Sequence, residues 1–226
     1  LSMTLNGANG TTRTAMMEAL RLLGISVDEI NNSYKNLTEA LLSVDKRVLM
    51  TIANSVWTEN DFVVKQAFID ILTNYYDAES KSFDINDSSA PDKINTWIED
   101  NTNGLIKKMV DKLEDNTVML LINAIYFKGK WKSQFDESKT TDMPFYKTGS
   151  SQVDVPMMKQ EAEFSIHEGN GFVLAEFPYG QGNFVMDVIL PDEQNSVKDI
   201  MSSVSNNGFA RWIDRNSTRL TSRHTA

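Results

Sequence analysis

Two long apolar segments place the strongest limits on how this chain can fold. Val48 to Trp57 and Val118 to Phe127 consist almost entirely of apolar or small residues. Neither segment has a stripe of polar residues that could face water, which is typical of strands buried on both faces. The sequence therefore predicts two long strands that are covered on either side by other elements.

Each of these segments contains one asparagine, and each asparagine allows two interpretations. Asn54 lies in the first segment and Asn123 in the second. A buried amide costs a few kcal/mol unless it finds hydrogen-bond partners. One interpretation is an ordinary structural asparagine whose hydrogen bonds are satisfied. The other is a polar latch that pins neighbouring strands together in a sheet that must also open.

Apolar residues at helical spacing predict four helices in the first half of the chain. Ser89 is expected to cap the last of them, with Pro91 in its first turn. The helices run from Thr11 or Thr12 to Gly24, 28–42, 62–76 and from Ser89 to about Asn103. The sequence also predicts a turn over 5–10 and a short strand over 82–85. Leu1 to Leu5 is typical of the last turn of a helix, so the chain is expected to begin inside a domain.

After Trp131 the apolar residues follow the period of strands instead of helices. Glycine-containing turns separate these strands, which indicates an antiparallel sheet. The predicted strands are 143–148, 153–158, 172–177 and 184–190, and helical stretches are predicted near 197–204 and 209–214. Helices mixed with long strands and followed by a run of strands predict an α+β fold. Because no linker is visible, one domain is expected over residues 1–226.

The composition excludes several classes of function. The 226 residues carry a formal net charge of -9 and 22 scattered basic side chains, so no nucleic-acid surface is expected. The absence of cysteine excludes disulfides, thiolate catalysis and cysteine-bound zinc. The longest apolar run, Val118 to Phe127, is too short to span a bilayer.

No catalytic constellation is visible in the sequence. His167 lies in an alternating segment and is expected to be a surface histidine, and His224 sits in a polar tail. Asp84 to Asp87 lacks the glycine and the terminal glutamate of a calcium loop. Gly180 to Gly182 is expected to be a hairpin turn. We therefore expect no enzyme, no metal and no cofactor.

Five short motifs resemble those of one protein family. They are Leu5 to Thr11, Ile52 to Trp57, Leu121 to Trp131, Val155 to Met158 and Leu190 to Glu193. They are similar, in family order, to the turn after helix B, the second and third strands of sheet A, a sheet C motif and the end of a sheet B strand of serpins. The resemblance extends from Leu1 to about Asp214.

The resemblance implies an α+β serpin fold with large sheets A, B and C. It places Asn123 in the shutter, where the third and fifth strands of sheet A part. Asn54 would be a polar position on the second strand of sheet A. Trp131 would lie in the breach, where insertion begins. Pro91 to Asn101 would be the helix that lies across sheet A.

The resemblance also implies a suicide inhibitor of serine or cysteine endopeptidases. In such inhibitors the protease cleaves an exposed reactive loop and forms an acyl-enzyme, and the loop then inserts into sheet A as an added strand. The expected partner is a target protease, and the full-length protein is expected to be a monomer. The family suggests an extracellular, periplasmic or cell-envelope location.

The serpin fold needs more chain than these residues supply. The resemblance places the first helix before Leu1, and the reactive loop with the last strands after Ala226, so 1–226 would be a partial serpin domain. The tail from Asn216 to Ala226 does not continue the family pattern. Two alternatives stay open because the loop hinge is absent: a non-inhibitory carrier, storage protein or chaperone, and an inactive truncated product.

Overall fold

The computed structural model describes residues 1–147, 151–203 and 220–225 of the chain. The chain divides into two compact units, Leu1–Val44 with Leu49–Lys128 and Asp45–Val48 with Gly129–Ala226. Each unit combines helices with strands, which confirms the predicted α+β fold. That 1–226 is one partial domain stays a prediction.

Three strands form the sheet of the first unit. They are β1 (Val48–Glu59), β2 (Ala78–Phe83) and β3 (Met119–Gly129), in the order β2-β1-β3. β1 and β2 run parallel, with Asn54 opposite Ala78. The N–H of Glu59 donates to the carbonyl of Val118 at 2.9 Å, so the end of β1 lies beside the start of β3 and these two strands run in opposite directions. Both predicted long strands are confirmed, and the short strand begins at Ala78 instead of Ser82.

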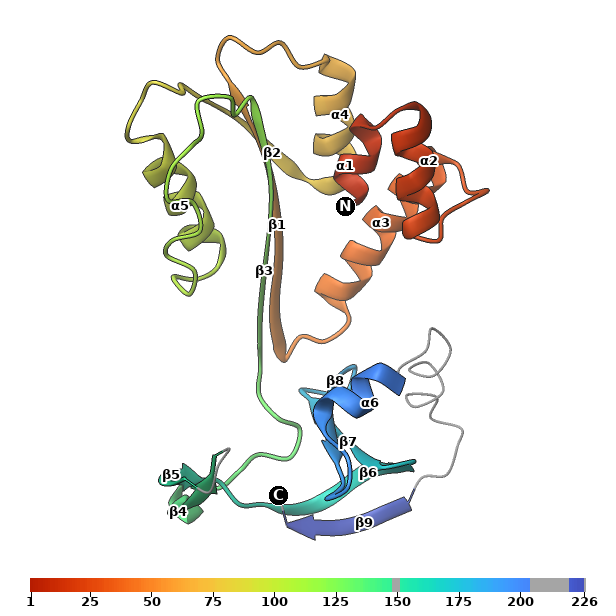
Figure 1. Cartoon of the computed structure of the whole chain (residues 1–226), viewed down its shortest axis with the longest axis vertical. Coiled ribbons are helices and arrows are strands. Elements are labelled where there is room, and N and C mark those ends of the chain that lie inside the picture. The colour runs from red at the N-terminus through yellow and green to blue at the C-terminus, as the bar shows by residue number, and fades with distance from the viewer. Residues whose placement is uncertain (148–150, 204–219, 226) are drawn as a thin grey trace. The chain divides into compact units, whose positions relative to one another are not determined.

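Helices cover both faces of this sheet. Figure 1 shows α5 on one side of the strands and α1, α3 and α4 on the other. Because successive side chains of a strand alternate between faces, Trp57 packs in the cluster with α5, whereas Val56 packs with Leu72 and Tyr76 of α4. The centre of β1 is therefore buried on both faces, as predicted.

The helices of the first unit follow the prediction with shifted ends. They are α1 (Ser2–Gly7), α2 (Gly10–Ala19), α3 (Val27–Ser43), α4 (Gln66–Tyr76) and α5 (Ala90–Asn101). Ser26 caps α3 by accepting the N–H of Glu29 at 3.2 Å. α4 begins at Gln66 and not at Phe62. The predicted turn over 5–10 is shorter than expected, because α1 continues to Gly7.

Two predictions for α2 are wrong. Its cap is Asn9, whose side chain accepts the N–H of Gly10, and not Thr11 or Thr12. The helix ends at Ala19, well before Gly24, because Arg21 adopts a left-handed conformation with φ of 58°. The apolar residues of α2 make no core, because none of its residues is buried.

The segment between α5 and β3 folds back onto α5. The side-chain oxygen of Asn95 accepts the N–H groups of Met109 and Val110 at 2.9 Å, and its nitrogen donates to the Val110 carbonyl at 2.7 Å. Ile106 and Leu113 of the same segment pack against the α5 cluster. One buried amide therefore holds this return segment against the helix.

The second unit is mainly antiparallel strands. A hairpin joins β4 (Thr141–Tyr146) to β5 (Gln152–Met157) after a short 3-10 turn, Glu137–Lys139. The larger sheet has the order β8-β7-β6-β9. Its strands are β6 (Glu161–Gly169), β7 (Phe172–Tyr179), β8 (Phe184–Pro191) and β9 (Leu220–Thr225), and α6 (Val197–Ser203) follows β8.

The predicted strands of this half are confirmed with ends shifted by a few residues. The polar tail forms a strand that the sequence did not predict. Residues 220–225 pair antiparallel with β6. The helical stretch predicted near 209–214 lies outside the described residues. In the described part of the chain, every helix is too short or too polar to cross a membrane.

A buried carboxylate fixes the turn between β7 and β8. Asp45 is 3% exposed and accepts the N–H groups of Gln181 at 2.7 Å and Arg47 at 2.9 Å. Gly180 has φ of 51°, and a Cβ there would lie 2.6 Å from the Asp45 carboxylate, so only glycine fits this close approach. This confirms the predicted turn at Gly180 to Gly182.

The hydrogen bonds to Asp45 predict an acid-sensitive contribution to stability. Burial by itself would raise the pKa of Asp45, but the Gln181 and Arg47 amides and the Asn183 side chain outweigh it, and the pKa lies below its ordinary value of 3.8. A carboxyl whose pKa is lower in the folded state stabilises the fold above its unfolded pKa. That contribution is lost as the pH falls through the folded pKa.

We expect Asp45→Asn to lower the urea midpoint of unfolding at pH 7. This decrease in the midpoint should become smaller as the pH falls towards 3. Asp154→Asn, the same change at an exposed position of β5, is the matched control and should leave the midpoint unchanged. An Asp45→Asn effect that stays constant from pH 7 to pH 3 would contradict this role.

Candidate functional site

The two asparagines singled out by the sequence lie side by side on adjacent strands. The side-chain nitrogen of Asn123 on β3 donates to the side-chain oxygen of Asn54 on β1 at 2.8 Å. The nitrogen of Asn54 in turn donates to the backbone carbonyl of Tyr76 at 2.7 Å. One amide thus connects β3, β1 and the end of α4.

The burial of the two asparagines differs. Asn54 is 3% exposed, as predicted, but the prediction that Asn123 is buried is wrong. β3 alternates, with Ile122 and Tyr126 buried and Asn123, Ile125 and Phe127 exposed. The reason is that the cluster around α4 takes in the first residues of β3, such as Leu121, and does not extend to Ile125, which is 54% exposed.

This difference makes the two ends of the bond between the asparagines unequal. Asn54 has both ends of its amide satisfied inside the protein, and a buried group left without a partner costs about 1–3 kcal/mol. Asn123 is exposed, so water can take the place of Asn54 at its own amide, but the Asn54 oxygen that accepts the bond is buried, so breaking the bond is expected to cost about 1–3 kcal/mol. Asn54 is therefore a fixed anchor, and its oxygen depends on Asn123 for a partner.

Sequence reasoning missed the residues that surround this pair. The hydroxyl of Tyr76 donates to the side-chain oxygen of Asn31 at 2.7 Å, and Asn31 and Asn6 exchange two hydrogen bonds of 2.9 Å. Tyr76 was expected only as the end of a helix. Asn31 does carry a signal, because it follows Ile30 on the apolar face of α3 and yet is polar. A polar residue on an apolar face needs a partner.

Trp131, the third predicted site residue, lies in the second unit. Its ring stacks on Tyr179 with centroids 4.2 Å apart and an interplanar angle of 16°, and Phe177 meets its edge at 6.0 Å. The backbone also pairs, because Lys132 donates to the carbonyl of Pro178 at 2.8 Å. Ring stacking and a backbone hydrogen bond therefore hold the residues that follow β3 against the end of β7 within this unit.

The described residues offer no assembly for catalysis or metal binding. Among 1–147, 151–203 and 220–225, no group of three His, Asp or Glu side chains could hold a metal ion. His167 on β6 is half-buried with its ring 6.4 Å from that of Phe172. The side chain of His224 lies outside the described part of the chain.

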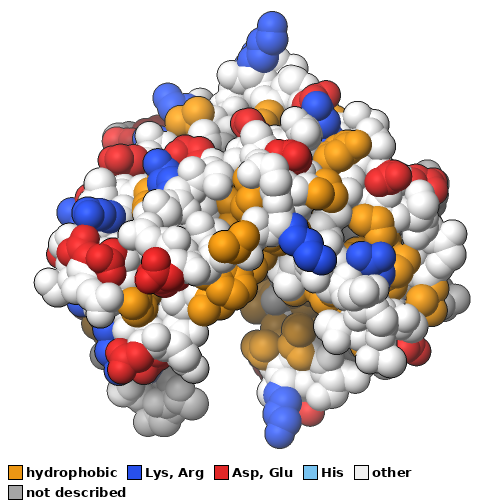
Figure 2. Space-filling view, turned by 90° about the horizontal axis from the view of Figure 1, so that it is seen from above, with side chains coloured by type: hydrophobic (Ala, Val, Ile, Leu, Met, Phe, Trp, Pro, Cys, Tyr) orange, Lys and Arg blue, Asp and Glu red, His pale blue; other side chains and the backbone are white. Residues whose placement is uncertain are grey.

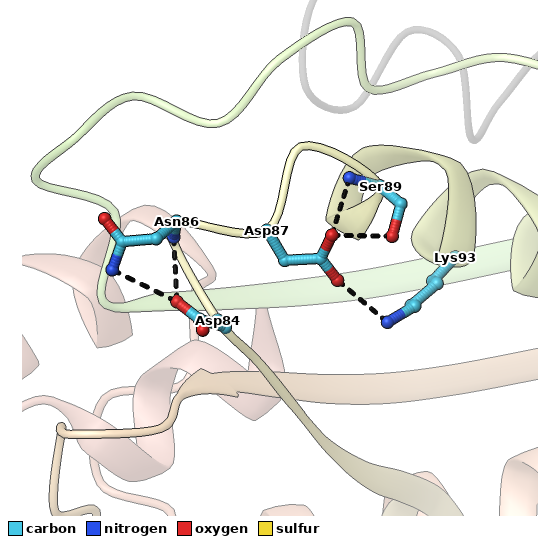
Figure 3. Close-up of polar contacts among 5 residues, drawn as sticks. All are labelled: Asp84, Asn86, Asp87, Ser89 and Lys93. Carbon is cyan, nitrogen blue, oxygen red and sulfur yellow. Dashed lines mark hydrogen bonds and ion pairs between the residues drawn. The ribbon is translucent and has the colours of Figure 1, made fainter.

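The acidic loop before α5 is occupied by the protein's own donors (Figure 3). Asp84 accepts the backbone and side-chain nitrogens of Asn86 at 2.8 and 3.2 Å. Asp87 accepts Lys93 at 2.9 Å and both the N–H and the hydroxyl of Ser89. Ser89 is the N-cap residue of α5 and Pro91 lies in its first turn, as predicted, but the Ser89 side chain makes no capping bond because its hydroxyl turns back to Asp87. Bonds from Lys93 and Ser89 hold the pKa of Asp87 well below its usual range.

Basic side chains are dispersed over the surface. On the face shown in Figure 2, lysines and arginines are scattered and do not gather into one patch. The described ion pairs are local and exposed, such as Lys81 with Glu79 and Lys108 with Asp111. This pattern does not form the basic stripe that nucleic-acid binding needs.

Comparison with known proteins identifies the family to which the chain belongs. Residues 1–224 match the sequence profile of the serpins, a family of serine protease inhibitors. The chain belongs to the serpin family. Serpins inhibit proteases and are not themselves enzymes, so the prediction that this chain is not an enzyme is confirmed at the level of the family.

Curated serpins of two kinds show the extent of the similarity. Neuroserpin from Gallus gallus is 32% identical over 199 residues, which are 83% of this chain and 48% of that protein. Serpin B9 from Homo sapiens is 31% identical over 218 residues, which are 94% of this chain and 57% of that protein. The chain thus spans about half the length of these serpins.

Solved serpin structures confirm the fold. The native state of tengpin, a thermophilic serpin, has a TM-score of 0.86 and 30% identity, and the match covers 99% of this chain and 57% of tengpin. Ovalbumin from emu has a TM-score of 0.91 at 23% identity, with 100% of this chain and 62% of ovalbumin covered. The predicted serpin fold is therefore confirmed for the part of it that this chain spans.

The role of Asn54 as a buried anchor predicts a large effect of its removal. Asn54→Ala leaves the Tyr76 carbonyl without its buried partner and frees Asn123, and we expect the free energy of unfolding in urea to fall by about 2–3 kcal/mol. Asn116→Ala, at an exposed asparagine outside the sheet, should change it by less than about 0.5 kcal/mol. Equal effects of the two substitutions would show that Asn54 is not an anchor.

Proposed function

We propose that these residues are the opening sheet of a serpin-type suicide inhibitor of serine or cysteine endopeptidases. The observation that carries the proposal is the place of β3, which the bond between Asn123 and Asn54 ties to β1. Among the described strands, β3 is the last in the order β2-β1-β3, so the proposal adds a further strand on its far side. Strand addition of this kind is how a serpin loop enters its sheet.

In the proposed mechanism the protease supplies the chemistry and this sheet supplies the driving force. The nucleophile of the protease attacks a peptide carbonyl of the reactive loop, the C–N bond breaks, and the new amine leaves with a proton. The acyl-enzyme then moves with the loop as it inserts beside β3. The reactive loop and its scissile bond would come from residues outside this sequence.

Insertion next to β3 requires the sheet to part at low cost. We assign Asn123 to the shutter, because it lies on β3, beside which the loop would insert, and its bond to Asn54 keeps β3 paired with β1 while the other side of β3 opens. Asn54 keeps its bond to Tyr76 and holds β1 in place. We assign Trp131 to the breach, since it directly follows β3 and its stacking on Tyr179 fixes the chain there.

The partner that follows from this proposal is a target protease, and the full-length protein is proposed to be a monomer outside the cytoplasm or in the cell envelope. The proposal is tested by incubating the full-length protein with trypsin, subtilisin and papain. A covalent complex that survives denaturing electrophoresis is expected with at least one of them. Complete cleavage without such a complex would overturn the inhibitor proposal and favour a carrier, storage or chaperone role.

The latch itself predicts a defined change in conformational stability. In the full-length protein, Asn123→Ala should speed conversion to latent or polymeric forms roughly threefold to tenfold, because one bond of about 1 kcal/mol between the strands is lost. Native gel electrophoresis after incubation below the unfolding midpoint measures this rate. Asn170→Ala, an exposed asparagine in the turn between β6 and β7, is the control. If Asn123→Ala keeps the wild-type rate, the latch assignment is wrong.

A further inference from the structure

Tyr76 makes hydrogen bonds at the candidate site through both its backbone carbonyl and its side-chain hydroxyl. Its backbone carbonyl accepts the amide of Asn54, and its hydroxyl donates to the side-chain oxygen of Asn31. The residue is 3% exposed, and its ring packs on that of Tyr34 with centroids 4.4 Å apart. A single buried residue therefore joins the sheet to the helices on one of its faces.

We propose that Tyr76, Asn31 and Asn6 are positioning residues for the bond between Asn54 and Asn123. They hold the end of α4 where its last carbonyl meets Asn54, and Asn54 in turn presents its oxygen to Asn123 on β3. The coupling rests on the contacts between these residues. Its consequence for loop insertion rests on the proposed function.

The carbonyl of Tyr76 is available because α4 ends there. The last carbonyls of a helix have no partner within the helix. Asp77 adopts a left-handed conformation with φ of 49°, and its N–H returns to the carbonyl of Leu72, which closes the helix. The side-chain amide of Asn54 thus takes the place of a helix cap. The position of this cap depends on where the last turn of α4 lies.

The side chain of Tyr76 fixes that last turn. Asn31 is fully buried and Asn6 half-buried, and each donates to the other at 2.9 Å. The hydroxyl of Tyr76 joins this pair, donating to Asn31 at 2.7 Å and accepting from Asn6 at 3.2 Å. Burial raises the pKa of Tyr76, so the hydroxyl stays protonated and keeps donating at neutral pH. α1, α3 and α4 therefore meet at one buried polar point.

The experiment is hydrogen exchange of the backbone amides of 119–129 in the full-length protein. Tyr76→Phe keeps the ring and removes only the hydroxyl. We expect it to speed exchange in β3 roughly fivefold to tenfold, since about one hydrogen bond of support is lost. Tyr75→Phe makes the same change in the neighbouring half-buried residue and should leave β3 unchanged. Exchange in β7 should not respond to either substitution.

A comparison in the Asn54→Ala background separates positioning from general destabilisation. If Tyr76 acts through Asn54, Tyr76→Phe should have no further effect on β3 once Asn54 is removed. The proposal would be overturned if Tyr76→Phe increased the exchange rate of β3 by the same factor in both backgrounds, or if exchange rose uniformly and included β7. Asn6→Ala is the second variant, with a smaller effect in the same direction, should Tyr76→Phe fail to fold.

This readout is independent of inhibition, because it needs no protease. A protein that forms no complex with proteases but shows Asn54-dependent exchange would overturn the proposed function and leave the coupling intact. A working inhibitor in which hydrogen exchange of β3 does not change in Tyr76→Phe would overturn the coupling and leave the proposed function intact.

Discussion

The buried amide of Asn54 is the interaction on which the first unit depends. An amide removed from water must keep both its oxygen and its nitrogen bonded, and here the oxygen faces β3 and the nitrogen faces the end of α4. The sheet and the helix cannot shift independently without breaking one of these bonds. The apolar clusters on either face supply most of the burial, but they are not directional in this way.

The two sides of β3 are held very differently. On one face, Ile122 and Ala124 are buried in the α5 cluster, to which the return segment clasped by Asn95 also belongs. On the other face, Ile125 and Phe127 are exposed beyond Asn123. At its edge towards β1, the side-chain contact is the bond that Asn123 donates to the buried oxygen of Asn54. β3 can therefore keep its contacts with the α5 cluster while a different strand comes to lie beside it.

The sequence predicted what depends on local pattern and missed what depends on distant partners. The apolar run around Val56 correctly predicted a strand buried on both faces, and the alternation after Trp131 predicted the antiparallel strands. The same reasoning failed for β3, because burial of Asn123 depends on which elements reach that face. Both asparagines were found one by one as polar residues in apolar strands. Their contact with each other, and the role of Tyr76, depend on strand register and on the end of α4, which no local pattern encodes.

The burial of Asn31 has a consequence for producing this protein. Asn31, Asn32 and Ser33 form an acceptor pattern for N-linked sugars. In the fold, the nitrogen that would carry the sugar is bonded to Asn6 and fully enclosed. A secretory host that attaches sugars before folding is complete would therefore produce chains in which α3 cannot close against α1. Ser33 is exposed, so replacing it with alanine removes the acceptor pattern and leaves the buried asparagine in place.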